Sequence, residues 1–239
     1  MTPRAAYAAA ALAAAVLVGC STGGTEKTKA ENPRAVLAQA KTILDSATSV
    51  QVVITSVGVP PGVTGLVGGE GIAARPASFE GDLEVSVGGG VLTVGVVSVD
   101  GTVYVKTPFT PDYVPTDPAQ FGLSDPADLL DPDTGVSRLL PAAVGARFGR
   151  DARVDGEVVR TVSARIAGET VDEVLATADP SRRVDAVFHI ARDTGKLRGA
   201  RLTGPFFAAD ADSTYTIVLD GYDDPVDITA PPTSAAAAS

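Results

Sequence analysis

The sequence predicts an α+β fold built on one broad, curved antiparallel sheet. Apolar and polar residues alternate along many short segments, which is the period of a half-buried strand. Short turns such as Asp100-Gly101 and Asp155-Gly156 join several of these segments and favour hairpins. Helical segments rarely separate successive strands, which argues against parallel β-α-β units. We expect roughly eight to ten strands and about three or four short helices.

The first element is a helix over residues 32–48. Asn32 is a preferred N-cap residue, and Pro33 suits the first helical position. Helical spacing then gives one apolar face, which consists of Val36, Ala40, Ile43, Leu44 and Ala47.

After this helix the hydrophobic period changes to two. Strands are expected at 50–54, 83–87, 91–99 and 102–106. Gly88-Gly89-Gly90 and Asp100-Gly101 supply the turns between the last three of these strands. The segment 59–75 reads as a long, glycine-rich loop.

The middle of the chain is less regular. Residues 108–132 are rich in Pro and Asp and contain a short helix at 126–130. A second helix is expected at 134–144, with a break or kink at Pro141.

The rest of the chain returns to strands. We expect them at 152–154, 158–166, 184–191, 196–203 and 213–219, with a helix at 168–178. A short last strand is expected at 226–229. The low-complexity end, 231–239, predicts a disordered tail.

The N-terminus reads as a secretory signal over residues 1–19. Arg4 precedes a short apolar stretch, and Leu17-Val18-Gly19-Cys20 resembles the lipobox of bacterial lipoproteins. In such precursors the thiol receives a diacylglyceryl group and the cysteine becomes the first residue. The alternative is a lone cysteine inside an apolar helix. Cys20 is the only cysteine, so internal disulfides and cysteine-based metal sites are excluded.

Residues 20–31 then form a lipidated cysteine with a flexible tether, and residues 32–230 form a single domain. No second apolar run approaches the ~18 residues needed to span a bilayer, so attachment depends on the acyl anchor. The net charge of −10 argues against nucleic acid or another polyanion as a partner.

The sequence gives little indication of a catalytic or metal-binding site. His189 is the only histidine, and alternation places it with Asp185 on the wetter face of its strand. A Ser-His-Asp site lacks any ordered signature here, so an exposed strand histidine is the simpler interpretation. The Asp-rich loop 117–133 does not match an EF-hand, and its aspartates suit turn or helix capping. We therefore expect no catalytic residue, no metal and no cofactor.

The most unusual feature is the aliphatic face that many strands share. This face indicates either an open cavity suited to flexible acyl chains or an ordinary filled core, and the pattern alone leaves both open. Glycines such as Gly81 and Gly95 would let the sheet bend. If a cavity exists, the lining we expect is Leu83, Val85, Val87, Leu92, Val94, Val96, Val103, Val105, Ile43, Leu44, Leu139, Leu140, Phe188, Ile190 and Ile217.

Several segments carry a resemblance to known proteins. They are Cys20 with its polar tether, the strand–turn segment 83–106, Asp131-Pro132-Asp133-Thr134-Gly135-Val136, and the closing segment 225–232. Together they resemble the LppX/LprA/LprF/LprG family of mycobacterial and related actinobacterial lipoproteins, the LprG-like members above all. The loop at 59–75 is longer and richer in glycine than the family pattern.

The resemblance implies a half-barrel sheet wrapped around helices, similar to the LolA/LolB carriers, with a large apolar cavity. Members of the family move triacylated lipids and glycolipids from the plasma membrane towards the cell envelope, and an apolar residue at the position of Leu83 lines the cavity. LprG-like members also work alongside an efflux transporter of the major facilitator type.

We therefore expect a monomeric, non-enzymatic lipid carrier anchored to the outer face of the plasma membrane. The alternatives are a scaffold lipoprotein that holds no lipid and, in third place, a lipid-modifying hydrolase.

Overall fold

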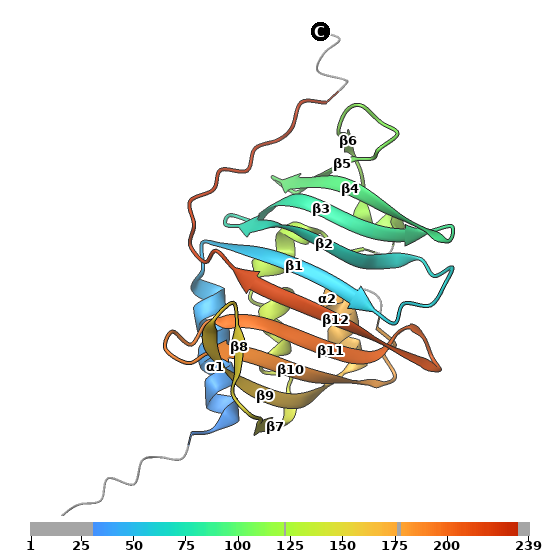
Figure 1. Ribbon diagram of the computed structural model, residues 1–239. Helices are drawn as coiled ribbons and strands as arrows, with labels where there is room; N and C mark the ends of the chain where they lie inside the picture. Colours follow the sequence, from blue (N-terminus) through green and yellow to red (C-terminus); the bar gives the residue numbers. More distant parts are fainter. Residues whose placement is uncertain (1–30, 122, 176–177, 234–239) are drawn as a thin grey trace, which may run out of the picture. The chain divides into compact units, whose positions relative to one another are not determined.

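The computed structural model describes residues 31–121, 123–175 and 178–233 (Figure 1). Within these residues the strands form one 12-stranded antiparallel sheet in the order β6-β5-β4-β3-β2-β1-β12-β11-β10-β9-β7, with β8 paired to β9 outside this path. The strands are β1 (Ser49–Val57), β2 (Gly65–Ala74), β3 (Ser78–Val87), β4 (Gly90–Val99), β5 (Thr102–Lys106), β6 (Val114–Pro115), β7 (Val144–Phe148), β8 (Ala152–Val154), β9 (Glu157–Ala167), β10 (Arg183–Ala191), β11 (Leu197–Ala208) and β12 (Ala211–Asp220). The predicted α+β class is confirmed, with more strands than expected.

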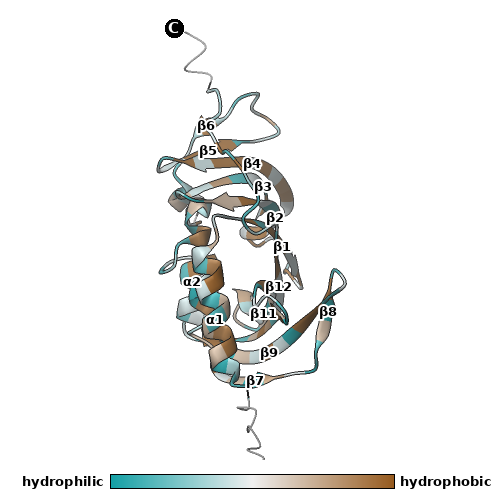
Figure 2. Cartoon of the chain, turned by 90° about the vertical axis from the view of Figure 1, so that its left-hand side faces the viewer, coloured by the Kyte–Doolittle hydropathy of each residue, from teal (hydrophilic) through white to brown (hydrophobic). Residues whose placement is uncertain are grey.

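Two α-helices and three short 3-10 helices lie on the inner side of the curved sheet (Figure 2). They are α1 (Pro33–Ser46), α2 (Gly168–Leu175), η1 (Pro118–Phe121), η2 (Pro126–Leu130) and η3 (Val136–Leu139). No helix among the described residues is long and apolar enough to cross a membrane.

Helix α1 begins as the sequence predicts. The side chain of Asn32 accepts a hydrogen bond from the Arg34 N–H at 3.0 Å, and Pro33 lies in the first turn. The buried stripe includes Leu37, which the predicted face omitted, while Val36 and Ile43 are only half-buried. The helix thus presents a slightly rotated apolar face to the sheet.

The predicted tight turns are confirmed. Asp100 and Gly101 have φ of 53° and 71° and connect β4 to β5. Asp155 and Gly156, at 48° and 85°, connect β8 to β9. Left-handed backbone at both central residues matches the right-handed twist of the flanking strands, which is why Asp-Gly favours hairpins.

The loop expected at 59–75 is wrong, because most of it forms strand β2. The strand pairs with β1 on one side and β3 on the other. Its glycines interrupt the alternation of apolar and polar residues that reveals a strand in sequence. At least one of them is required by close packing, since a Cβ on Gly71 would lie 2.6 Å from the carbonyl oxygen of Glu80 in β3.

The helix expected at 134–144 is also wrong. Only the short turn η3 forms, and Val144 begins the edge strand β7, which pairs with β9. Pro141 has no N–H and cannot continue a helix, so the chain leaves the helical conformation near this residue.

The C-terminal segment differs from expectation in two ways. Residues 226–229 form no strand, although Ile228 is buried with Ala74 and Val97 in a small second cluster. Part of the predicted disordered tail also has a defined place, because Thr233 forms an isolated bridge with Tyr113. The remainder of that tail, 234–239, lies outside the described residues.

Candidate functional site: an apolar cavity under half of the sheet

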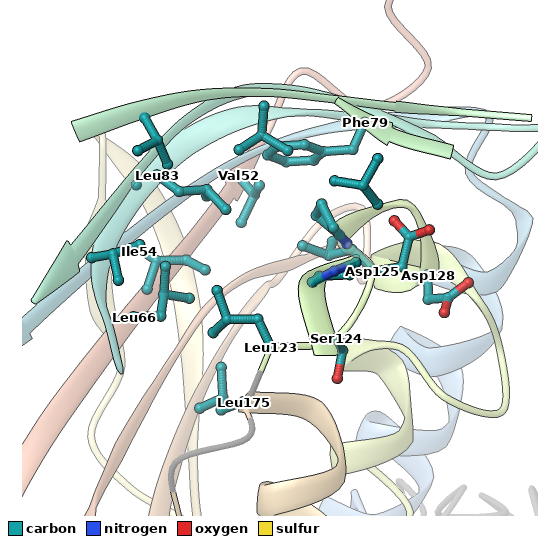
Figure 3. A pocket seen from close by; sticks show the side chains of 18 of the residues that line it. Val52, Ile54, Leu66, Phe79, Leu83, Leu123, Ser124, Asp125, Asp128 and Leu175 are labelled. Carbon is teal, nitrogen blue, oxygen red and sulfur yellow. The ribbon is translucent and has the colours of Figure 1, made fainter. Parts of the chain in front are cut away.

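A cavity of about 450 Å³ lies between the inner face of strands β1–β5 and the segments that carry η1–η3 and α2 (Figure 3). Its sheet side is almost entirely aliphatic. The strand residues that line it are Val52, Ile54, Leu66, Phe79, Leu83, Val85, Val87, Leu92, Val94, Val96, Val103, Val105 and Ile217. The opposite wall includes Leu123, Leu129, Val136, Val174 and Leu175.

Strand register explains why this wall is so uniform. In the β3–β4 pair Leu83 lies opposite Val94, and Val85 lies opposite Leu92. The intervening residue, Glu84, is exposed on the other face, as side-chain alternation requires. Apolar side chains therefore collect on the inner face along most of this pair, and the polar Ser98 lies only at its end, opposite Phe79.

The structure places part of the predicted lining around this cavity. Leu83, Val85, Val87, Leu92, Val94, Val96, Val103, Val105 and Ile217 line it. Ile43, Leu44, Leu139, Leu140, Phe188 and Ile190 do not.

These last residues occupy the other half of the concave face, where the structure has a filled core. Leu44 of α1, Leu139 of η3 and Phe188 of β10 are each only 1% exposed. Helices α1 and α2 pack against β7, β9, β10 and β11 in this part of the sheet, whereas the short turn η2 is what packs against β2–β4. One half of the sheet therefore borders a cavity, and the other half borders a filled core.

Several residues that line the cavity were not predicted from the sequence. Val52 and Ile54 belong to a strand whose alternation was recognised, so the same signal could have placed them. Leu66 lies in the missed strand β2. Leu123 and Leu129 lie in irregular segments, where no periodicity marks the inward side.

The segment Asp131–Val136 shapes one wall of the cavity. The Asp131 carboxylate accepts hydrogen bonds from the N–H groups of Asp133 and Thr134 at 2.8 and 2.9 Å, which hold its pKa below the usual range. A Cβ on Gly135 would collide with the carbonyl oxygens of Leu129, Asp128 and Asp131, so only glycine fits there. The turn therefore requires glycine at position 135, and a polar residue there would not be sufficient.

Four acidic residues are among those that line the cavity. They are Glu70, Asp125, Asp128 and Glu173. Burial raises the pKa of Asp128, and the neighbouring charges of Asp125 and Asp131 raise it further. Asp125 also has a structural role, because its Oδ1 accepts hydrogen bonds from the Ser98 hydroxyl at 2.7 Å and from the Ala127 N–H at 2.9 Å.

His189 lies away from this cavity, half-buried on the outer face of the sheet. Its ring Nδ1 lies 3.5 Å from the Thr161 hydroxyl. Asp185, which shares its face, forms an exposed ion pair with Arg165 instead. Burial and the charge of Arg201 lower the pKa of His189.

A second hollow of about 240 Å³ on this outer face includes His189 and Arg198. Arg198 forms ion pairs with two carboxylates, since its guanidinium lies 2.5 Å from Asp220 and 3.1 Å from Glu157. Elsewhere in the described part of the chain, no cluster of His, Cys, Asp and Glu is suited to hold a metal ion.

The predicted lipid anchor, Cys20, and most of the predicted tether lie outside the described residues. The last tether residue, Glu31, is described and forms an ion pair with Arg160 at 2.6 Å.

Comparison with known proteins adds sequence relatives that match most of the chain. The family model LppX_LprAFG lipoprotein matches residues 32–228. The lipoarabinomannan carrier protein LprG of Mycobacterium tuberculosis is 25% identical over 241 residues, which cover 95% of this chain and 94% of that protein. Its counterpart from Mycobacterium leprae is 24% identical over 93% of this chain and 92% of its own length.

Solved structures share the fold. LprF from Mycobacterium bovis superposes with a TM-score of 0.70 at 19% identity and covers 83% of this chain and 96% of its own. LppX from Mycobacterium tuberculosis gives a TM-score of 0.62 at 17% identity, covering 82% and 98%.

Proposed function

Because the chain belongs to the LppX_LprAFG lipoprotein family, as the resemblance of its motifs indicated, we propose that it is a non-enzymatic lipid carrier. The single observation that carries this proposal is the aliphatic cavity of about 450 Å³ under β1–β5. Relatives named as carriers of a glycolipid support it. The cargo would be a triacylated lipid or glycolipid, moved from the plasma membrane towards the cell envelope.

The mechanism is shielding of acyl chains from water. Each methylene group left in water would cost about 0.8 kcal/mol, whereas a chain that moves from a bilayer to the cavity exchanges one apolar environment for another. The net free energy of transfer is then close to zero, so loading and release are both accessible.

Cavity volume limits what can be enclosed in this conformation. A methylene group is similar in size to a water molecule, whose share of the liquid is ~30 Å³. The cavity of about 450 Å³ therefore has room for about 15 such groups, or about one long acyl chain. A lipid with three chains requires the 3-10 segments to move away from the sheet, or leaves chains outside the cavity.

The proposal includes the targeting inferred from sequence. Residues 1–19 would direct export, and acylated Cys20 would hold the domain, as a monomer, at the outer face of the plasma membrane. A transporter of the major facilitator type is the proposed protein partner, in line with the LprG-like members.

Mass spectrometry of the organic extract tests the proposal. The protein with Cys20→Ser, produced in an actinobacterial host, should release an acylated lipid in a near-stoichiometric amount. Leu83→Trp should abolish this lipid because the indole fills the cavity. The matched control is Val53→Trp, at an exposed position of β1 on the outer face.

One result would reject the carrier role, and another would reject this cavity as the binding site. If the folded wild-type protein releases no lipid, the chain is better explained as a scaffold lipoprotein. If Leu83→Trp retains the same lipid as the wild type, the cavity is not its binding site. Turnover of lipid that is lost in His189→Ala would instead support the hydrolase.

A further inference from the structure

Two neighbouring hairpins of the sheet have uncharged, apolar tips. The β1–β2 connection and the β3–β4 turn lie side by side at the right-hand end of the sheet in Figure 1, because β2 pairs with both β1 and β3. These tips, residues 57–64 and 87–91, contain no charged residue, although 20% of the chain is charged. Val57, Val87 and Val91 are 66%, 51% and 64% exposed. The two tips form an apolar rim at this end of the sheet.

The cavity reaches the surface at the apolar rim. Thr64 and Val87 belong to the rim, line the cavity and are exposed. The short turn η2 packs against the opposite end of β2–β4, where the Ser98 hydroxyl donates to the Asp125 carboxylate at 2.7 Å. The rim is therefore at one end of the cavity, and η2 is at the other.

The filled half of the sheet has charged tips at the same end. The β11–β12 turn lies next to the rim, because β12 pairs with β1, and it exposes Asp210 and Asp212. Arg182 and Arg183 are exposed where β10 begins. The uncharged tips thus coincide with the cavity and not with the filled core.

A lipid bilayer is the partner whose chemistry matches this rim. Valine and proline side chains offer apolar area without the charged groups that give protein interfaces their specificity. Shallow insertion into the interfacial region of a bilayer buries such side chains and leaves the backbone of the turns close to water and headgroups. An acyl chain could then pass from the bilayer to the cavity without crossing water, which removes the cost of exposing its methylene groups.

Resting on the proposed lipid-carrier function, we propose that the apolar rim docks on the surface of a lipid bilayer and sets the open end of the cavity against it. The proposed anchor permits this contact, since the ~11 residues between Cys20 and Glu31 can extend to ~36 Å. This reach exceeds the ~30 Å length of the nine-residue strand β1. Anchoring also keeps the rim at a high local concentration near the membrane, so a weak apolar contact is enough to orient the domain.

Uptake of lipid from a bilayer and from a carrier without a bilayer tests the proposal. The Cys20→Ser protein would be mixed with pyrene-labelled diacylglycerol, held either in dioleoylphosphatidylcholine vesicles or in methyl-α-cyclodextrin, and protein-bound pyrene would be followed with time. Val57→Glu combined with Val91→Glu should slow uptake from vesicles at least about tenfold, because two carboxylates would have to enter the interfacial region. Neither residue lines the cavity, so uptake from cyclodextrin should equal that of the Cys20→Ser parent.

Phe148→Glu combined with Val226→Glu is the matched control. Phe148 and Val226 are 39% and 37% exposed and belong to β7 and the C-terminal segment, so the pair makes the same change of charge outside the rim. Uptake by this control from vesicles should stay within about twofold of the parent. Uptake by the parent should also change less than about twofold between about 0.05 and 0.5 M salt, since an apolar contact is not screened.

The outcomes separate this inference from the function on which it rests. If the rim variant takes up lipid from vesicles as fast as the parent, or is impaired equally with cyclodextrin, the rim is not a bilayer contact and the carrier function stands. Uptake by the parent that falls steeply with salt would also overturn apolar docking. If the folded parent takes up lipid from neither source, the carrier function itself fails.

Discussion

Phe79 packs directly over Gly71 of the neighbouring strand. A Cβ on Gly71 would lie 2.5 Å from Cζ of Phe79, which is only 1% exposed and lines the cavity. The space that this glycine leaves holds the largest side chain of the cavity wall. The residue that hid this strand from sequence analysis is also one that shapes the candidate site.

Gly71→Ala should consequently destabilise the protein. The added methyl group has to displace Phe79 and the backbone of Glu80, and overpacking of this kind costs about 1–3 kcal/mol. The free energy of unfolding from urea denaturation measures the effect. Gly90→Ala is the control, since its Cβ would meet nothing closer than the Val87 carbonyl oxygen at 4.0 Å. Equal stability of the two variants would contradict the packing argument.

Lys41→Met should loosen the wall of the cavity that contains η3. The Lys41 ammonium lies 2.9 Å from Asp45, 2.7 Å from the Pro132 carbonyl oxygen and 3.1 Å from the Ser137 hydroxyl, and so joins α1 to the turn at 131–137. Loss of these charged hydrogen bonds should lower the free energy of unfolding by about 1.5–3 kcal/mol. Lys106→Met is the control, because the Lys106 ammonium only lies over the Tyr113 ring, at 5.9 Å. A Lys41→Met protein as stable as this control would show that the hydrogen bonds of Lys41 do not contribute to stability.

Asp220→Asn should lower stability at neutral pH and lose that effect in acid. The hydrogen bond from the buried Arg198 holds the pKa of Asp220 below its usual 3.8. A depressed pKa in the folded state stabilises the protein above the unfolded-state value and ceases to do so as pH falls through the folded-state value.

We expect a loss of about 1 kcal/mol at neutral pH, since Asp220 is more than half exposed and solvent screens the pair. The difference from wild type should shrink below about pH 4. Thermal unfolding across this range measures it, and Asp185→Asn, in an exposed pair with Arg165, should change stability little. A difference that stays constant with pH would show that ionisation of Asp220 does not matter.

His189→Gln should reduce the sensitivity of the fold to mild acid. Burial first, and Arg201 second, lower the pKa of His189 below 6.5 in the folded state. The unfolded chain therefore binds a proton at higher pH than the folded chain, and stability falls as pH drops below about 6.5. Melting temperatures at neutral pH and about pH 5 should differ less in the variant than in the wild type. An unchanged difference would show that His189 stays accessible to protons in the fold.

The sequence by itself determined the local structure of this protein. Alternation placed most strands, Asp100-Gly101 and Asp155-Gly156 placed hairpins, and Asn32-Pro33 placed the start of α1. These features depend on contacts between near neighbours in the chain, so residue type is enough to specify them. The same alternation also identified much of the cavity wall.

Only the tertiary structure decided which part of the aliphatic face is hollow. Leu83 and Phe188 have the same inward alternation, yet Leu83 lines the cavity and Phe188 is packed in the core. The difference arises from what lies opposite each half: α1 and α2 pack against β7 and β9–β11, whereas the short turn η2 packs against β2–β4 and leaves space. Periodicity reports the direction of a side chain, whereas empty volume depends on where distant segments come to rest.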